Sequence, residues 1–230
     1  MIKETINRLQ SELPATVKLV AVSKFHPFEA IEEAYSAGQR IFAESRPQEL
    51  MAKVKRLEEI RTEKGNPTYM SDIQWHFIGH LQTNKLKMVL PYVSLIQSVD
   101  SVRLLEAIDS WGLTNGKVIN ILLEPHVAAE ESKQGFSKDE LLAVLSDHSR
   151  YGSICFRGLM GMATFTDDES LIRSDFAAVR RIFDEALIKN PSLSGFFTEL
   201  SIGMSDDYRI AVEYGSTMVR IGSMIFGERY

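Results

Sequence analysis

The sequence has a single cysteine, no long hydrophobic run and no excess of basic over acidic residues, and each of these absences excludes a class of protein. Cys155 is the single cysteine, so the chain can form no internal disulfide and no zinc site built on clustered cysteines. No window approaches the roughly eighteen apolar residues of a transmembrane helix. The formal charge is −5 at pH 7 and no Lys/Arg block stands out, which argues against a nucleic-acid partner.

What remains is the composition of an ordinary globular protein. Of the 230 residues, 44% are hydrophobic and 25% are charged, which excludes a disordered chain. The first fourteen residues carry charges throughout, so we expect no secretory signal. With the single cysteine, this predicts a cytoplasmic protein without a membrane partner. The length favours one domain over residues 1–230.

Short apolar runs alternate with amphipathic segments along the chain. The eight predicted strands are residues 17–24, 40–45, 73–79, 93–99, 117–124, 154–163, 196–202 and 218–221. The predicted helices are residues 28–38, 48–63, 83–88, 102–111, 138–150, 170–188 and 206–214, with an extra helix in residues 1–13. Such alternation predicts a parallel α/β sheet. Eight repeats favour a closed (β/α)₈ TIM barrel over an open doubly wound sheet.

Function in such a barrel gathers at the carboxyl ends of the strands, and Lys24 closes the first apolar run. Desolvation by the surrounding core lowers the pKa of a lysine, and a neutral amine attacks a carbonyl to form a Schiff base. The alternative is a lysine whose stem lies along the core and whose ammonium group pairs with a carboxylate. Position alone favours this alternative.

The last two predicted strands lead into glycine-rich segments. Gly203 and Gly222 allow the backbone to approach an anion, as in the phosphate sites of barrels. Ser201 and Ser223 add hydroxyl donors, and Arg220 adds a positive charge. Alternatively, the glycines only form tight turns and Arg220 pairs with an acid. A strand-ending lysine combined with a phosphate cradle describes a site for a phosphorylated aldehyde.

Other candidates point to structural roles. His76 and His80 lie four residues apart, as metal ligands on a helix do, but the segment reads as a strand and its exit. We therefore predict two structural histidines and no metal site. Cys155 begins a buried strand and is expected in the core. Ser201 has no histidine in its own segment, so a Ser-His-acid hydrolase is not supported.

Five motifs together resemble the pyridoxal phosphate homeostasis proteins, an alanine-racemase-like family. They are AVSK (21–24), AYSAGQRIFAESRPQE (34–49), WHFIGHLQTNK (75–85), GLMGMATF (158–165) and LSIGMSDDYRIAVEYGSTMVRIGSMIFGERY (200–230). The resemblance extends over nearly the whole chain. It implies a single barrel of the fold-type III kind, like the N-terminal domain of alanine racemase and without that enzyme's C-terminal β domain.

The resemblance also implies a ligand, pyridoxal 5′-phosphate (PLP), and a role for each site residue. Lys24 matches the lysine that holds PLP as a Schiff base, and Ser201 matches a serine that contacts the phosphate. Gly222 and Ser223 match the backbone donors of the phosphate loop. Arg220 matches an arginine that faces the phosphate or the ring nitrogen, and the sequence leaves both contacts open. The implied partners are PLP and apo-enzymes that receive it.

Two positions depart from the commonest family pattern, Phe-Gly-Glu-Asn. Here Ala43 replaces the glycine and Ser45 replaces the asparagine. A serine is shorter and offers a hydroxyl in place of an amide, so one cofactor contact is lost or bridged by water if that position touches PLP.

Three functions fit these residues. The first is a PLP carrier in intracellular PLP homeostasis, without catalytic residues. The second is a PLP-dependent amino-acid racemase or related enzyme. The related racemases add a β domain with a catalytic tyrosine, whereas this sequence ends shortly after the last predicted strand, so we expect the carrier. The third is a phosphosugar aldolase, in which Lys24 bonds to the substrate and the purified protein has no chromophore.

Overall fold

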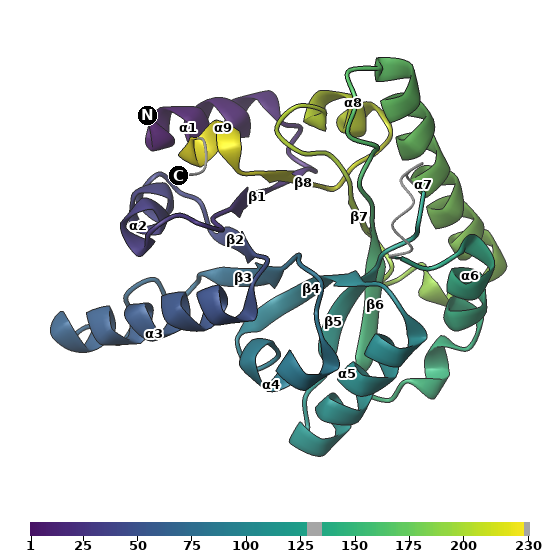
Figure 1. Cartoon of the computed structure of the whole chain (residues 1–230), viewed down its shortest axis with the longest axis horizontal. Helices are drawn as coiled ribbons and strands as arrows, with labels where there is room; N and C mark the ends of the chain where they lie inside the picture. The colour runs from purple at the N-terminus through teal and green to yellow at the C-terminus, as the bar shows by residue number, and fades with distance from the viewer. Residues whose placement is uncertain (128–134, 228–230) are drawn as a thin grey trace.

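A closed barrel of parallel strands forms the centre of the molecule, with strand order β1-β2-β3-β4-β5-β6-β7-β8 (Figure 1). The computed structural model describes residues 1–127 and 135–227. The strands are β1 (Lys18–Val22), β2 (Ile41–Glu44), β3 (Gln74–Phe77), β4 (Val93–Val99), β5 (Ile119–Leu123), β6 (Ile154–Met160), β7 (Glu199–Ser201) and β8 (Met218–Ile221). The predicted (β/α)₈ barrel is therefore confirmed.

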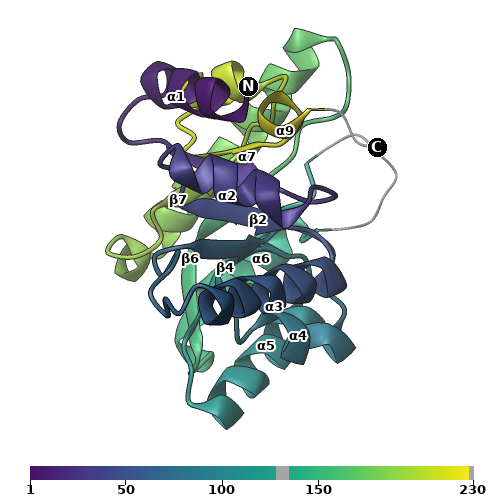
Figure 2. The ribbon, with the colours of Figure 1, turned by 90° about the vertical axis from the view of Figure 1, so that its left-hand side faces the viewer.

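Helices surround the barrel (Figures 1 and 2). The α-helices in the described residues are α1 (Ile2–Glu12), α2 (Phe28–Ser36), α3 (Pro47–Glu63), α4 (Leu86–Val89), α5 (Val102–Asn115), α6 (Lys138–Ser146), α7 (Glu169–Lys189), α8 (Tyr208–Glu213) and α9 (Ser223–Phe226). Short 3₁₀ helices lie at Thr83–Lys85, His148–Arg150 and Pro191–Leu193. Among these elements, none has the length and apolar character needed to cross a membrane.

The predicted order of elements is correct, while several bounds differ. β4 and β8 have the predicted limits, but β1 ends at Val22, two residues before Lys24. β6 and β7 are also shorter than predicted. The predicted strands were too long because apolar residues continue past the strand ends into the barrel mouth, where they are also partly buried. The short helix α9, which follows β8, was not predicted.

Alternate residues of β1 face two separate cores, which explains why the strand is apolar on both faces. Leu19 and Ala21 pack in the layer between the sheet and the helices. Val20 and Val22 pack inside the barrel with apolar residues from other strands, including Met160. Full burial of such side chains stabilises the fold by about 1.5–3 kcal/mol each. This two-sided burial is typical of parallel sheets covered by helices.

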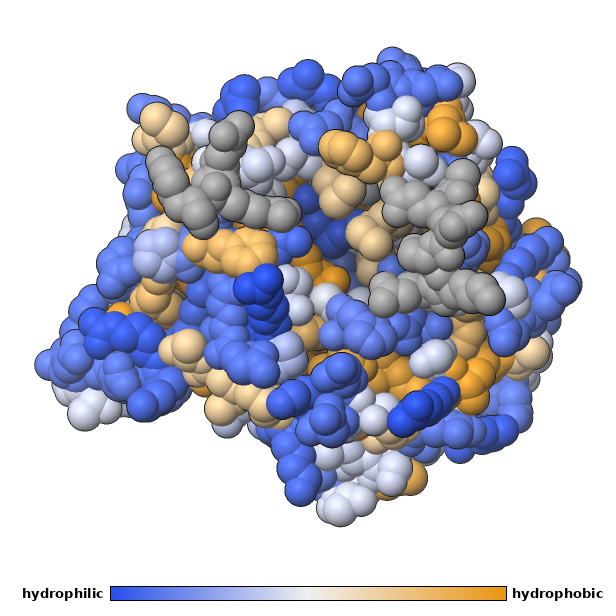
Figure 3. All heavy atoms as spheres, in the orientation of Figure 1, coloured by the Kyte–Doolittle hydropathy of each residue, from blue (hydrophilic) through white to orange (hydrophobic). Residues whose placement is uncertain are grey.

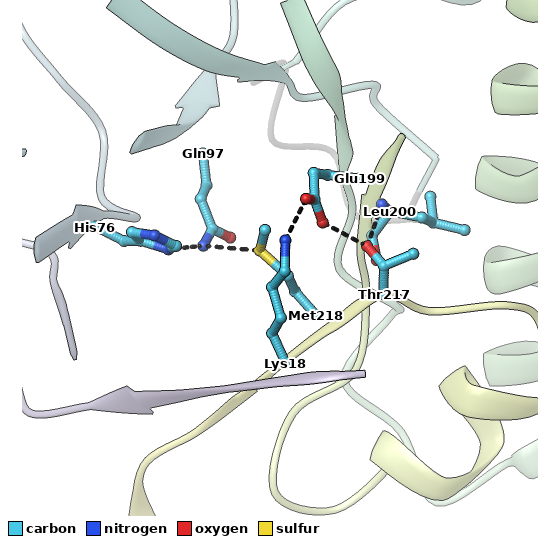
Figure 4. A network of polar contacts seen from close by, with 7 residues as sticks. All are labelled: Lys18, His76, Gln97, Glu199, Leu200, Thr217 and Met218. Carbon is cyan, nitrogen blue, oxygen red and sulfur yellow. Dashed lines mark hydrogen bonds and ion pairs between the residues drawn. The ribbon is translucent and has the colours of Figure 1, made fainter. Parts of the chain in front are cut away.

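Polar side chains also meet inside the barrel (Figure 4). The Gln97 amide of β4 lies 2.9 Å from His76 Nδ1 of β3, and burial lowers the pKa of His76 to about 3. His76 is therefore neutral at pH 7. Lys18 of β1 forms an ion pair with Glu199 of β7, whose other carboxylate oxygen accepts a hydrogen bond from Thr217.

Candidate functional site

A cavity of about 340 Å³ opens where the carboxyl ends of β1, β3, β6 and β8 meet. This volume lies within the range of small-molecule sites, about 300–1,000 Å³. Lys24, Arg220, Gly222 and Ser223 all line it, so the fold brings together four of the five predicted site residues. Figure 3 shows a hollow near the centre of this face, with hydrophobic residues along its edge.

Lys24 lies in the loop that joins β1 to α2, beyond the end of the strand. Its side chain is half-buried and lines the cavity beside His26 and Val22. The next residue, Phe25, has a φ of 69°, a left-handed conformation that a bulky side chain seldom adopts. The lysine is thus presented by a tightly constrained turn.

Arg220 supplies a fixed positive charge at the wall of the cavity. Its Nη1 donates to the carbonyl and the hydroxyl of Ser201, each at 2.7 Å, and its Nη2 donates to the Gly161 carbonyl at 2.9 Å. Burial lowers the pKa of Arg220 to about 10, so the guanidinium stays charged at neutral pH. Three bonds from one planar group leave it little freedom to rotate.

The chain turns sharply between β8 and α9, and this turn forms one side of the cavity. A Cβ at Gly222 would lie 3.2 Å from the Val22 carbonyl oxygen, so glycine lets this backbone lie tightly against β1. Ser223 begins α9, and its hydroxyl donates to Ser205 at 3.1 Å. The turn at Gly222 and Ser223 therefore lines the same cavity as Lys24.

Ser201 lies behind Arg220. It is fully buried, its hydroxyl donates to Gln97 Oε1 at 2.7 Å, and it accepts the bond from Arg220. A polar chain thus crosses the barrel from His76 through Gln97 and Ser201 to Arg220. The predicted contact between Ser201 and a phosphate stays a prediction, because this geometry assigns the hydroxyl first to the guanidinium.

The two residues that depart from the family pattern are accommodated without distortion. Ala43 is a regular member of β2, paired with Val22 on one side and His76 on the other, so the backbone there needs no glycine. The Ser45 backbone packs against Gly79, where an added Cβ would lie 2.0 Å from the Ser45 carbonyl oxygen. The effect of either residue on a cofactor stays a prediction.

Sequence reasoning missed a buried ionic cluster behind Lys24. Glu44 is fully buried, and its Oε1 accepts from Lys53 Nζ at 2.7 Å and from the Ser23 hydroxyl at 2.6 Å. Desolvation raises the pKa of this carboxyl. One signal was present: Lys53 occupies a position in the buried stripe of α3 between Leu50 and Leu57. A charge at a core position implies a buried partner.

The two histidines of the third motif occupy different surroundings. His76 points into the barrel toward Gln97, whereas His80 lies after β3 with its Nδ1 2.9 Å from Asp100 Oδ2. A strand sends residues four apart to the same face, but here the chain leaves the sheet between them. Each histidine has a side-chain partner, as a structural role requires.

Comparison with known proteins extends these findings. The family model for the N-terminal domain of alanine racemase matches residues 1–230. The pyridoxal phosphate homeostasis protein of Haemophilus influenzae is 34% identical over 98% of this chain and 91% of its own length. PipY of Synechococcus elongatus, solved with PLP bound, has a TM-score of 0.88 and 36% identity, with 99% of this chain and 100% of PipY covered.

A more distant likeness concerns the fold alone. Alanine racemase of Clostridium difficile has a TM-score of 0.74 and 12% identity, and the match covers 56% of that enzyme. The closed barrel with a lysine and an arginine at its mouth defines the class, the alanine-racemase-like barrel proteins. Within that class, the chain belongs to the pyridoxal phosphate homeostasis protein family.

Proposed function

We propose that this protein binds PLP, carries it covalently on Lys24 and serves intracellular PLP homeostasis without turning over amino acids. The observation that carries the proposal is one cavity that holds the Lys24 side chain, the Arg220 guanidinium and the turn at Gly222 and Ser223. The names of the relatives and the PLP in the PipY structure support it.

The residues present fit this cofactor. When bound, PLP supplies an aldehyde, which condenses with an amine with loss of one water, and a phosphate anion. Lys24 provides the amine. The backbone at Gly222 and Ser223, tight against β1, provides donors for an anion. Arg220 would offer a fixed positive charge to the phosphate or the ring nitrogen, and Ser201 holds the guanidinium in place.

The proposal also covers the fate of the cofactor, the location of the protein and its domain organisation. The protein passes its bound cofactor to apo-forms of PLP-dependent enzymes. It does so in the cytoplasm, and its PLP-binding barrel is a single domain over residues 1–230. The carrier is favoured over the racemase because the homeostasis protein of Haemophilus influenzae and PipY are 34% and 36% identical to this chain, whereas the racemase of Clostridium difficile, at 12% identity, shares only the fold. Transfer of bound PLP to an apo-enzyme, followed by the activity that the enzyme gains, tests the proposed fate of the cofactor.

Lys24 should be the residue to which PLP becomes covalently attached. Purified protein incubated with PLP becomes yellow, and borohydride fixes the cofactor on Lys24, as peptide mass spectrometry detects. Lys24→Arg keeps the charge but abolishes covalent labelling, because a guanidinium is too weak a nucleophile. The matched variant Lys55→Arg, at an exposed position of α3, labels like the wild type.

Two results would contradict this proposal. A protein that stays colourless with PLP does not carry the cofactor, and the aldolase hypothesis then gains support. Efficient deuterium exchange at the α-carbon of alanine, abolished by Lys24→Ala, identifies a racemase-like enzyme instead.

A further inference from the structure

The loop between β1 and α2, which carries Lys24, contains a residue in a backbone conformation that its side chain does not favour. Phe25 has a φ of 69° without being a glycine. A bulky residue stays in this region only where the surrounding structure holds it there. The contacts on both sides of Lys24 are therefore informative.

Three hydrogen bonds with side chains of β2 and α3 hold the residues before and after Lys24. The Ser23 hydroxyl donates to Glu44 Oε1 at 2.6 Å, and the Ser23 carbonyl accepts from Lys53 Nζ at 2.7 Å. The Phe25 amide donates to Glu49 Oε1. The loop is thus held at both peptide neighbours of the lysine.

Lys53 connects these contacts. Its ammonium group donates to Glu44 at 2.7 Å, to Glu49 at 3.1 Å and to the Ser23 carbonyl, which uses all three of its protons. The side chain is 7% exposed. Buried ion pairs of this kind add little stability over an apolar core, because desolvation offsets the attraction, and their best-attested effect is to fix geometry.

We propose that Lys53 and Glu49 are positioning residues, which hold the β1–α2 loop so that Lys24 reaches an aldehyde in the cavity. Glu44 anchors Lys53 from within the core. This inference rests on the proposed function and concerns the rate at which Lys24 captures PLP. On this inference, side chains of α3, a helix on the outside of the barrel, set the position of the Lys24 amine at the barrel mouth.

The test compares four variants on the intact protein. Glu49→Leu removes the acceptor for the Phe25 amide, and Glu49→Gln restores an oxygen there. Lys53→Met removes the link to Ser23, and Lys55→Met is its control, since Lys55 is a lysine of the same helix with a side chain 79% exposed. Covalent capture of PLP is followed by stopped-flow absorbance. Pyridoxine 5′-phosphate, which has no aldehyde, reports non-covalent binding.

We expect Glu49→Leu and Lys53→Met to slow capture about tenfold or more, because misplacement of a reacting group by about 1 Å has effects of this size. The affinity for pyridoxine 5′-phosphate should change by less than about twofold, since these substitutions leave the turn at Gly222 and Ser223 unchanged. Glu49→Gln and Lys55→Met capture PLP like the wild type. Hydrogen exchange of the Phe25 amide, measured without PLP, accelerates in Glu49→Leu.

Each other outcome is decisive. Capture at the wild-type rate by Glu49→Leu, despite faster exchange of the Phe25 amide, overturns the inference alone. Equal losses of PLP capture and of pyridoxine 5′-phosphate binding also overturn it, because the cluster is then only structural. If Lys53→Met does not fold, the two Glu49 variants decide the question. A wild type that gains no absorbance with PLP overturns the proposed function as well.

Discussion

Glu124 follows β5 at the mouth of the barrel, and its surroundings keep it protonated to unusually high pH. Burial raises the pKa of the Glu124 carboxyl to about 7, and the Asp100 carboxylate adds to the rise. Arg220 and His80 act in the opposite direction and lower the pKa of Glu124. The folded protein therefore retains a proton on Glu124 that the unfolded chain, with an ordinary carboxyl pKa of 4.5, releases.

The raised pKa of Glu124 makes the stability of the fold depend on pH. Between pH 4.5 and about 7 the folded state binds more protons at Glu124, so the stability that Glu124 contributes is lost as pH rises through this range. Glu124→Gln does not titrate, and we expect its free energy of unfolding at pH 8 to exceed the wild-type value by on the order of 2 kcal/mol. Urea denaturation at pH 4.5 and pH 8 measures this.

Glu33→Gln on the exposed face of α2 is the control for Glu124→Gln. It should change stability equally at both pH values. A Glu124→Gln protein with the same pH dependence as the wild type would contradict the raised pKa.

The individual site residues were predictable to different degrees. Lys24, Arg220, Gly222 and Ser223 meet in one cavity because each ends or follows a strand, and strand ends converge in a barrel. The partner of Ser201 was not predictable. Whether a buried hydroxyl faces a ligand or a neighbouring guanidinium depends on side-chain packing across strands, which spacing along the chain does not encode.

At the scale of elements, β6 contains a glycine that no other residue can replace. Gly158 has a φ of 151°, and an added Cβ would lie 1.7 Å from the Glu199 carbonyl oxygen of β7. The pairing of β5 with β6 shifts register just before this residue, as at a bulge. The glycine lets β7 lie close enough to carry Ser201 into the barrel.

We therefore expect Gly158→Ala to cost more than about 3 kcal/mol of unfolding free energy or to prevent folding, because backbone atoms cannot yield as a side chain does. Gly195→Ala is the matched control, since a Cβ there meets nothing within 4 Å. Thermal melting followed by circular dichroism separates the two. Similar melting temperatures for Gly158→Ala and the wild type would refute the close approach.

Element type was easier to predict than element limits. The order of strands and helices followed from periodicity, but β1 stops at Val22 because the Ser23 carbonyl accepts from Lys53 and the Phe25 amide donates to Glu49. Both of these side chains come from α3, elsewhere in the sequence. A strand ends where such competitors take over its hydrogen bonds, and no pattern within the strand reveals them.

The barrel as a whole encloses a histidine that must stay neutral. The folded-state pKa of His76 is about 3, against 6.5 in the unfolded chain. The stability from His76 is thus fully present above pH 6.5 and is lost as pH falls toward 3. The loss reaches about 1.4 kcal/mol per pH unit for one group.

His76→Asn tests this at the scale of global unfolding. Asparagine keeps an acceptor toward Gln97 and does not titrate, so the variant loses less stability than the wild type between pH 6.5 and pH 4.5. Guanidinium denaturation at both pH values measures the difference, with His148→Asn at the periphery as control. An unchanged acid sensitivity in His76→Asn would show that other groups govern it.

The barrel closes through β1 and β8, which pair along Lys18–Ala21 and Met218–Ile221. Lys24 follows the first strand and Gly222 follows the last. The two sides of the cavity therefore come together only when β8 has paired with β1. A chain still emerging from the ribosome exposes its lysine long before the opposite wall exists. The yellow colour proposed for the PLP-bound protein would therefore appear in a cell only in chains whose barrel has closed, and a translation product that stops before β8 would not acquire it.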